Sequence, residues 1–190
     1  MKTFSLLALL CSVSTPVCAF AGEVDPKILE YIDKNLRPVM ADAVVQSAMK
    51  QANAQHAGLA ESDILDLDAQ WRDQVGKPDQ PIITPVMKSD ASDVLRSLVA
   101  GSNGVATEVI VMDSLGLNVA VSDVTSDYWQ GDEAKFTNSF AAGLDAIDVS
   151  EVELDESTQT YQMQVSVVIP DAETGAPIGA VTIGLNAEAF

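Results

Sequence analysis

The side chains best suited to binding a small molecule are concentrated in one short stretch, residues 122–136. Tyr128 and Trp129 are adjacent there, and carboxylates flank them on both sides. An aromatic ring face attracts a cation, and a carboxylate adds a charge-assisted hydrogen bond to it. The stretch therefore predicts a pocket for a cationic group such as an amine. The expected ligand contacts are Ser122, Asp123, Thr125, Asp127, Tyr128, Trp129 and Lys135.

An anionic ligand is the second interpretation of the same stretch. Lys135 could bind a carboxylate, helped by free amides at the start of the helix expected after Gly131. An amine or amino acid is favoured, and a carboxylate ligand stays open.

No catalytic or metal-binding pattern accompanies these residues. The sequence lacks a zinc-protease motif, a phosphate-binding loop and a dinucleotide fingerprint. Asp123, Thr125 and Asp127 have the spacing that opens a calcium-binding EF-hand loop, but Tyr128 and Ala134 stand where that loop needs glycine and glutamate. His56 is interpreted as a favourable group at the carbonyl end of a helix. We therefore expect neither an enzyme nor a bound cofactor or metal ion.

Residues 1–21 are typical of a secretory signal peptide. Lys2 provides the positive start, residues 4–13 the apolar centre, and Ala19-Phe20-Ala21 a cleavage site, with an earlier site ending at Ala19 left open. The apolar centre is too short to span a bilayer, and no later segment is long enough. We expect a periplasmic protein that does not insert into the membrane. Its net charge of −18 also disfavours nucleic acid and anionic lipid as partners.

The chain behind this stretch divides into two further segments, residues 22–104 and 105–190. The first has helical periodicity over residues 25–55 (with Pro38 expected to kink it or divide it in two), 62–75 and 90–100, with Asp25, Ser62 and Asp90 as N-caps. The second has strand patterns over residues 108–112, 118–122, 151–155, 161–169 and 178–185. A helix over residues 133–142, capped by Asp132, is expected between the second and third strands. This order predicts an α+β fold with an antiparallel sheet.

The order of elements in the second segment resembles that of Cache domains, extracytoplasmic sensor modules related to PAS domains. The matching stretches are Val-Met-Asp-Ser-Leu-Gly-Leu-Asn-Val-Ala-Val-Ser-Asp (111–123), Asp-Tyr-Trp-Gln-Gly-Asp-Glu (127–133) and Ile-Gly-Ala-Val-Thr-Ile-Gly-Leu (178–185). The resemblance implies a five-stranded antiparallel sheet with a long N-terminal helix packed on one face. It also implies that the loop after the second strand closes over the ligand pocket.

The same resemblance implies a sensing function. Cache domains are usually joined to a membrane helix and a kinase, cyclase or chemoreceptor. Because this chain ends at Phe190, just past its last strand, we expect it to act through a separate membrane receptor or histidine kinase. The alternative is a structural or adaptor protein whose core is filled by its own side chains and binds no ligand.

Overall fold

The computed structural model describes residues 24–155 and 160–190. The expected signal peptide, residues 1–21, lies outside the described residues, as does most of the expected turn 155–158. Within the described part of the chain, no helix combines the length and hydrophobicity needed to cross a bilayer.

The N-terminal helical stretch is divided near Pro38, as predicted. It consists of α1 (Pro26–Tyr31), a π-helical segment (Ile32–Leu36), α2 (Arg37–Met40) and α3 (Ala43–His56). Asp25 caps α1 by accepting a hydrogen bond from the Lys27 amide at 2.8 Å. Pro38 has no backbone N–H with which to donate a hydrogen bond to the preceding turn. In the segment just before α2, the helical hydrogen bonds widen to the π pattern. Asp42 then caps α3 by accepting from the Val44 amide at 2.8 Å.

Three further helices follow, and two of their caps differ from the prediction. They are α4 (Glu61–Gln74), α5 (Ile83–Met87) and α6 (Asp90–Gly101). Helix α4 begins after Ala60, whose amide donates to the Asp63 side chain at 2.9 Å, so Ser62 is not its cap. Helix α6 is capped by Ser89, which accepts from the Ser92 amide at 3.1 Å, so Asp90 lies in the first turn. Helix α5 lies within the segment that joins α4 to α6.

The sheet is antiparallel throughout, as predicted. Its strands are β1 (Ala106–Asp113), β2 (Asn118–Val121), β3 (Ile147–Val149), β4 (Glu153–Asp155), β5 (Thr160–Pro170) and β6 (Pro177–Asn186). The order is β2-β1-β6-β5-β3, and β4 also pairs with β5. The edge position beside β5, predicted as one strand over residues 151–155, is thus divided between two short strands. Strand β3 is only three residues long, so its alternation was too short to recognise.

The crossover from β2 to β3 is more irregular than the single helix predicted over residues 133–142. It contains α7 (Ala134–Thr137) and a 3₁₀ turn (Phe140–Ala142). Glu133 occupies the N-cap position of α7 without a side-chain hydrogen bond, so Asp132 is not the cap. Phe136 and Phe140 nevertheless meet as predicted, with ring centroids 5.1 Å apart.

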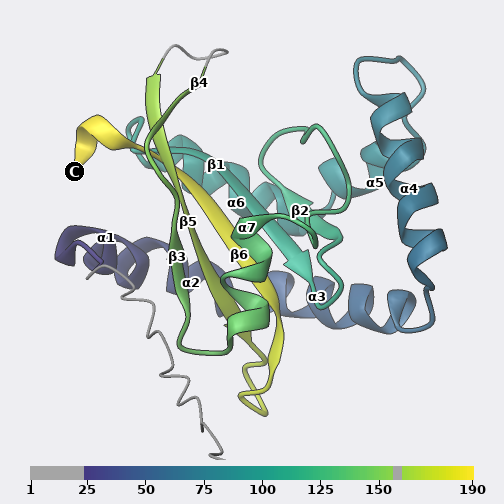
Figure 1. Cartoon of the computed structure of the whole chain (residues 1–190), viewed down its shortest axis with the longest axis horizontal. Helices are drawn as coiled ribbons and strands as arrows, with labels where there is room; N and C mark the ends of the chain where they lie inside the picture. The colour runs from purple at the N-terminus through teal and green to yellow at the C-terminus, as the bar shows by residue number, and fades with distance from the viewer. Residues whose placement is uncertain (1–23, 156–159) are drawn as a thin grey trace, which may run out of the picture.

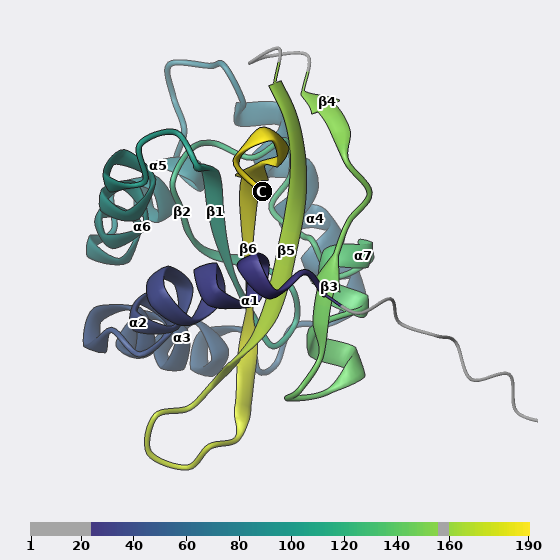
Figure 2. The same ribbon diagram turned by 90° about the vertical axis from the view of Figure 1, so that its left-hand side faces the viewer.

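The two faces of the sheet are covered differently. We call the face under α1–α3 and α6 the core face, and the opposite face, beside α7, the open face (Figures 1 and 2). The main apolar cluster lies on the core face and includes Val109, Val165 and Ile183, all fully buried. One half of the open face is also apolar, where Ile110 and Met112 pack with Phe136. Helix α4 stands to one side of the sheet (Figure 1).

An ion pair ties the β5–β6 turn to α3 and carries a pH-dependent prediction. The Asp171 side chain accepts from the amides of Glu173 and Thr174, both at 2.8 Å, and lies 3.1 Å from Lys50 Nζ. The two amides first, and Lys50 after them, lower the pKa of Asp171 to about 2. Because the pKa is lower in the folded state, this carboxylate stabilises the fold above about pH 4, and the contribution is lost as pH falls toward 2.

NMR titration of the Asp171 carboxyl carbon should show this pKa. In the Lys50→Met variant, the pKa of Asp171 should stay below its ordinary value of 3.8, because the two amides still donate to the carboxylate. A return to 3.8 would contradict the conclusion that the amides lower this pKa.

Candidate functional site

The other half of the open face carries polar side chains at positions where a sheet covered by a helix would be apolar. Ser166 on β5 and Thr182 on β6 are fully buried and share a hydrogen bond of 2.8 Å between their hydroxyls. Farther along the same strands, Gln164 Nε2 donates to Glu108 Oε1 at 3.0 Å. Thr107 Oγ1 donates to Gln162 Oε1 at 2.9 Å. Buried polar groups in proteins need hydrogen-bond partners, and here the side chains of the open face supply them to each other.

Gly184 makes the Glu108 contact geometrically feasible. A Cβ atom added at Gly184 would lie 2.8 Å from Glu108 Cγ and 2.4 Å from Thr107 Oγ1. The bare backbone of β6 therefore lets the Glu108 side chain cross it to reach Gln164. Gly184 is thus a point of close backbone approach within the strand.

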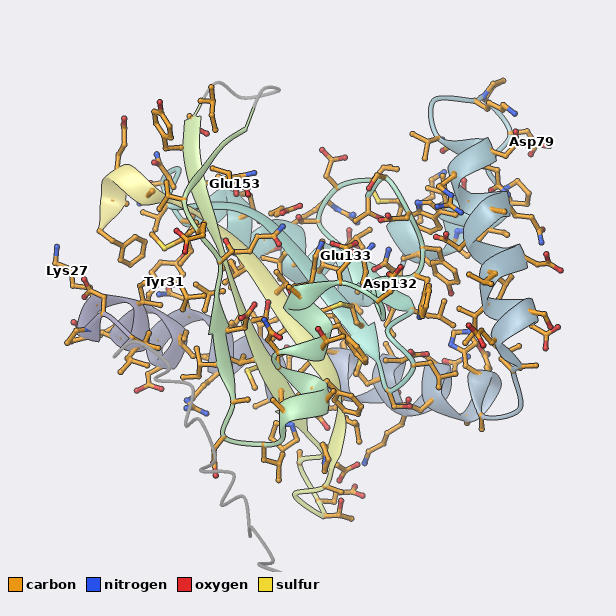
Figure 3. The ribbon with its side chains drawn as sticks, in the orientation of Figure 1. Lys27, Tyr31, Asp79, Asp132, Glu133 and Glu153 are labelled. Atoms are coloured by element: carbon orange, nitrogen blue, oxygen red, sulfur yellow. The ribbon has the colours of Figure 1, made fainter. Side chains whose placement is uncertain are left out.

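A hollow of about 550 Å³ lies between this polar half and the start of α7. Gln162 and Gln164 form its floor on β5, and Glu153 comes from β4. Figure 3 labels Glu153 beside β4 and Glu133 at the start of α7. The rest of the lining consists of Lys135, Ser150, Glu151 and Leu154. The volume falls in the range of small-molecule sites.

Lys135 is the one cationic group among the described residues that line this hollow. Its side chain is 12% exposed, lies 3.1 Å from Glu133 Oε2 and donates to Gln130 Oε1 at 2.9 Å. An ammonium group has three hydrogens, so one remains for a ligand. Glu133, Glu151 and Glu153 surround the same space with negative charge. The arrangement can bind a molecule that carries both a carboxylate and an ammonium group.

The first part of the predicted contact stretch makes its bonds within its own loop and to the neighbouring strands β1 and β2. Ser122 Oγ accepts from the Val109 amide at 2.9 Å and extends the β1–β2 pairing. Thr125 Oγ1 accepts from Asn118 Nδ2 at 2.9 Å, and the Asp127 carboxylate accepts from Gln130 Nε2 at 2.8 Å. Asp123 is exposed, and its own partner is the next amide in the chain. A ligand contact by these four residues stays a prediction.

The two aromatic residues of the stretch turn toward α4 rather than toward the hollow. The Tyr128 ring stacks on Trp71, with centroids 5.1 Å apart and planes 13° apart. Trp129 Nε1 donates to the Leu115 carbonyl oxygen at 2.8 Å. Burial first, and the negative charge of Asp113 second, raise the pKa of Tyr128 to about 12. Of the predicted contacts, the structure thus brings Lys135 to the hollow and Tyr128 to a different part of the surface.

A buried aspartate that the sequence analysis missed holds this loop. Asp68 Oδ1 on α4 accepts from the amides of Tyr128 at 2.9 Å and Trp129 at 3.1 Å, and Arg72 lies 2.8 Å from its other oxygen. In the sequence, Asp68 lies on the same helical face as Ile64 and Trp71, and an acid on such an apolar face indicates a buried hydrogen-bond partner. The polar positions Gln162 and Gln164, which alternate with buried residues, were a comparable signal for the hollow.

His56 also has a partner that the sequence did not suggest. It lies in the last turn of α3, as predicted, but its Nδ1 is 2.5 Å from Oδ2 of the fully buried Asp113. Among residues 24–155 and 160–190, no three His, Asp or Glu side chains gather closely enough to hold a metal ion.

No family model and no curated protein matches the chain. Among solved structures, it is similar to the sensory domain of the Campylobacter jejuni chemoreceptor Tlp3 with isoleucine bound, at 16% identity and a TM-score of 0.39, over 88% of this chain and 66% of the other. The ligand-binding domain of the Pseudomonas aeruginosa amino acid chemoreceptor PctC, in complex with GABA, matches at 16% identity and a TM-score of 0.42, over 84% and 62%.

An extracellular ligand-binding receptor from Desulfohalobium retbaense matches at 18% identity and a TM-score of 0.35, over 75% of this chain and 24% of the other. The chain thus spans slightly less than two thirds of the chemoreceptor domains it matches. At such TM-scores, the fold assignment rests on the chain's own strand order and antiparallel pairing. The three solved structures named above are a sensory domain, a ligand-binding domain and a ligand-binding receptor.

Proposed function

We propose that this protein is a periplasmic binding module that senses a small molecule in the open-face hollow and acts without catalysis. The observation that carries the proposal is the polar half of the open face, where Gln162 and Gln164 line the hollow and Glu108, Ser166 and Thr182 lie on the same face beside them. A protein whose sheet served only as a support would fill such positions with apolar side chains. The adaptor alternative lacks a comparable observation.

We infer that the ligand is an amino acid or a related amine. Lys135 would bind its carboxylate by a charge-assisted hydrogen bond, and the carboxylates of Glu133 and Glu153 would attract its ammonium group. A ligand with both charges would find an opposite charge in the hollow for each of its two groups. A separate membrane receptor or histidine kinase would then recognise the liganded state.

A thermal-shift screen with amino acids, amines and carboxylates tests the binding. A true ligand at ~100 times its dissociation constant adds about 2.7 kcal/mol to the free energy of unfolding. Lys135→Gln should then weaken binding of a carboxylate-bearing ligand by about 10-fold or more in calorimetry, since charge-assisted hydrogen bonds contribute ~1.5–3 kcal/mol.

The matched control is Lys77→Gln, which removes an exposed lysine paired with Asp73 on α4. It should leave the affinity unchanged. If Lys135→Gln binds as tightly as the wild type, the carboxylate is held elsewhere. If no compound in the screen stabilises the protein, the adaptor alternative is favoured instead.

A further inference from the structure

A second recess, which we call the α3–α5 groove, lies away from the open-face hollow. It runs between α3, α5 and the start of β2 and has a volume of about 390 Å³. Ala52, Ile82, Val86 and Val119 provide apolar walls. In a protein with a net charge of −18, no Asp, Glu, Lys or Arg lines this groove within the described chain. Its chemistry is therefore different from that of the hollow beside Lys135.

Asn118, at the edge of this groove, holds a hydrogen-bond acceptor without a partner. Its Nδ2 donates to Thr125 Oγ1 and to the Asp127 carbonyl oxygen, both at 2.9 Å, so the orientation of the amide is determined. Its Oδ1 is buried and has no hydrogen-bond partner among the described residues. A buried unpaired acceptor is costly. Asn118 Oδ1 therefore favours a hydrogen-bond donor supplied by a bound molecule. To reach this oxygen, the donor must pass the side chains that cover it.

Two further polar groups that line the α3–α5 groove have no hydrogen-bond partner in the described part of the chain. The Tyr128 ring is held by Trp71, and no hydrogen bond to its hydroxyl occurs in the described part of the chain. His56 directs Nδ1 to Asp113; in the tautomer that donates from Nδ1, Nε2 can accept a hydrogen bond, and it has no partner in residues 24–155 or 160–190. Because the pKa of Tyr128 is raised to about 12, its hydroxyl remains a neutral donor.

We propose that the α3–α5 groove is a second binding site, which takes an uncharged small molecule with an apolar body and a carboxamide head. The head matches the groups present, since its carbonyl oxygen accepts from the Tyr128 hydroxyl and its N–H donates to His56 Nε2 or Asn118 Oδ1. Apolar walls with a few directed polar groups are the usual composition of such sites. A charged head would lose its hydration without gaining an opposite charge from the lining.

Benzamide is a suitable probe, with benzoate and benzylamine as matched compounds that carry a charged head on the same ring. In backbone amide NMR spectra of the whole chain, benzamide should shift the signals of Gln55, Val119 and Tyr128 in a saturable way, and the charged compounds should not. Tyr128→Phe keeps the ring on Trp71 and removes the hydroxyl alone. It should weaken benzamide binding by up to about 10-fold.

Two substitutions on α3 separate the groove from the helix that lines it. Gln55→Trp places a bulky ring at the groove and should abolish binding, whereas Ala54→Trp, exposed on the same turn but outside the lining, should not. Lys135→Gln should leave benzamide binding unchanged, so failure here is distinguishable from failure of the open-face site. The proposal is overturned if benzamide causes no saturable shifts, if Tyr128→Phe binds it equally well, or if benzoate or benzylamine binds the groove as tightly.

Discussion

Val165→Asp is expected to unfold the protein. Val165 is fully buried on the core face, where it pairs with Val149 on β3 and Ile183 on β6. A carboxylate there would have no cation within the apolar cluster, and a buried unpaired charge costs several kcal/mol. That is a large fraction of the stability of an ordinary domain, which is about 5–15 kcal/mol. Circular dichroism during urea unfolding would show the loss.

The matched control is Gln164→Asp, one residue earlier on the same strand and on the open face. Gln164 is only half-buried, so the new carboxylate stays hydrated, although it loses the bond to Glu108 and lies near that acid. We expect a loss of ~1 kcal/mol. Equal losses at both positions would mean that the two faces do not differ in the way described.

Trp71→Ala is expected to cost ~3–5 kcal/mol of unfolding free energy, the usual range for a large buried aromatic side chain. Trp71 is fully buried, stacks on Tyr128, and donates from Nε1 to the Thr125 carbonyl oxygen at 2.9 Å. The substitution therefore creates a cavity and also releases the loop after β2 from α4. Amide hydrogen exchange should report this release as faster exchange at Tyr128 and Trp129, whose amides pair with Asp68.

Leu65→Ala on the same helix serves as the comparison, because Leu65 is 45% exposed. It should change the free energy of unfolding by less than about 1 kcal/mol. A similarly small effect of Trp71→Ala would show that α4 does not hold this loop.

The elements of this fold that could be predicted are those defined by neighbours in sequence. Asp25 caps a helix through an amide two residues away, and Pro38 disturbs the turn that contains it. The alternation along residues 161–169 identified β5 as a strand, since successive side chains on a strand point to opposite faces. The predicted N-caps were wrong where two polar residues were adjacent, as at Ser89 and Asp90, because the local chemistry allows either residue to be the N-cap.

The candidate sites were only partly predictable. The stretch 122–136 was recognised as unusual, and it does supply Lys135 to the hollow and Tyr128 to the α3–α5 groove. The other groups that define these recesses come from distant segments. Glu108 meets Gln164 over 56 positions, His56 meets Asp113 over 57, and Asp68 meets Tyr128 over 60.

By itself, the sequence determined the class of fold and the approximate positions of its main helices and strands. These features depend on periodicity and on local backbone preferences, which are properties of short stretches. Only the tertiary structure decided that the aromatic pair turns to α4 while Lys135 turns to the sheet. These orientations depend on which polar groups come close enough to form buried hydrogen bonds. Because α4 packs beside the loop, Asp68 accepts hydrogen bonds from the amides of Tyr128 and Trp129. Pairings of this kind arise from packing between segments far apart in the chain, and residue order does not encode them in a form that local patterns reveal.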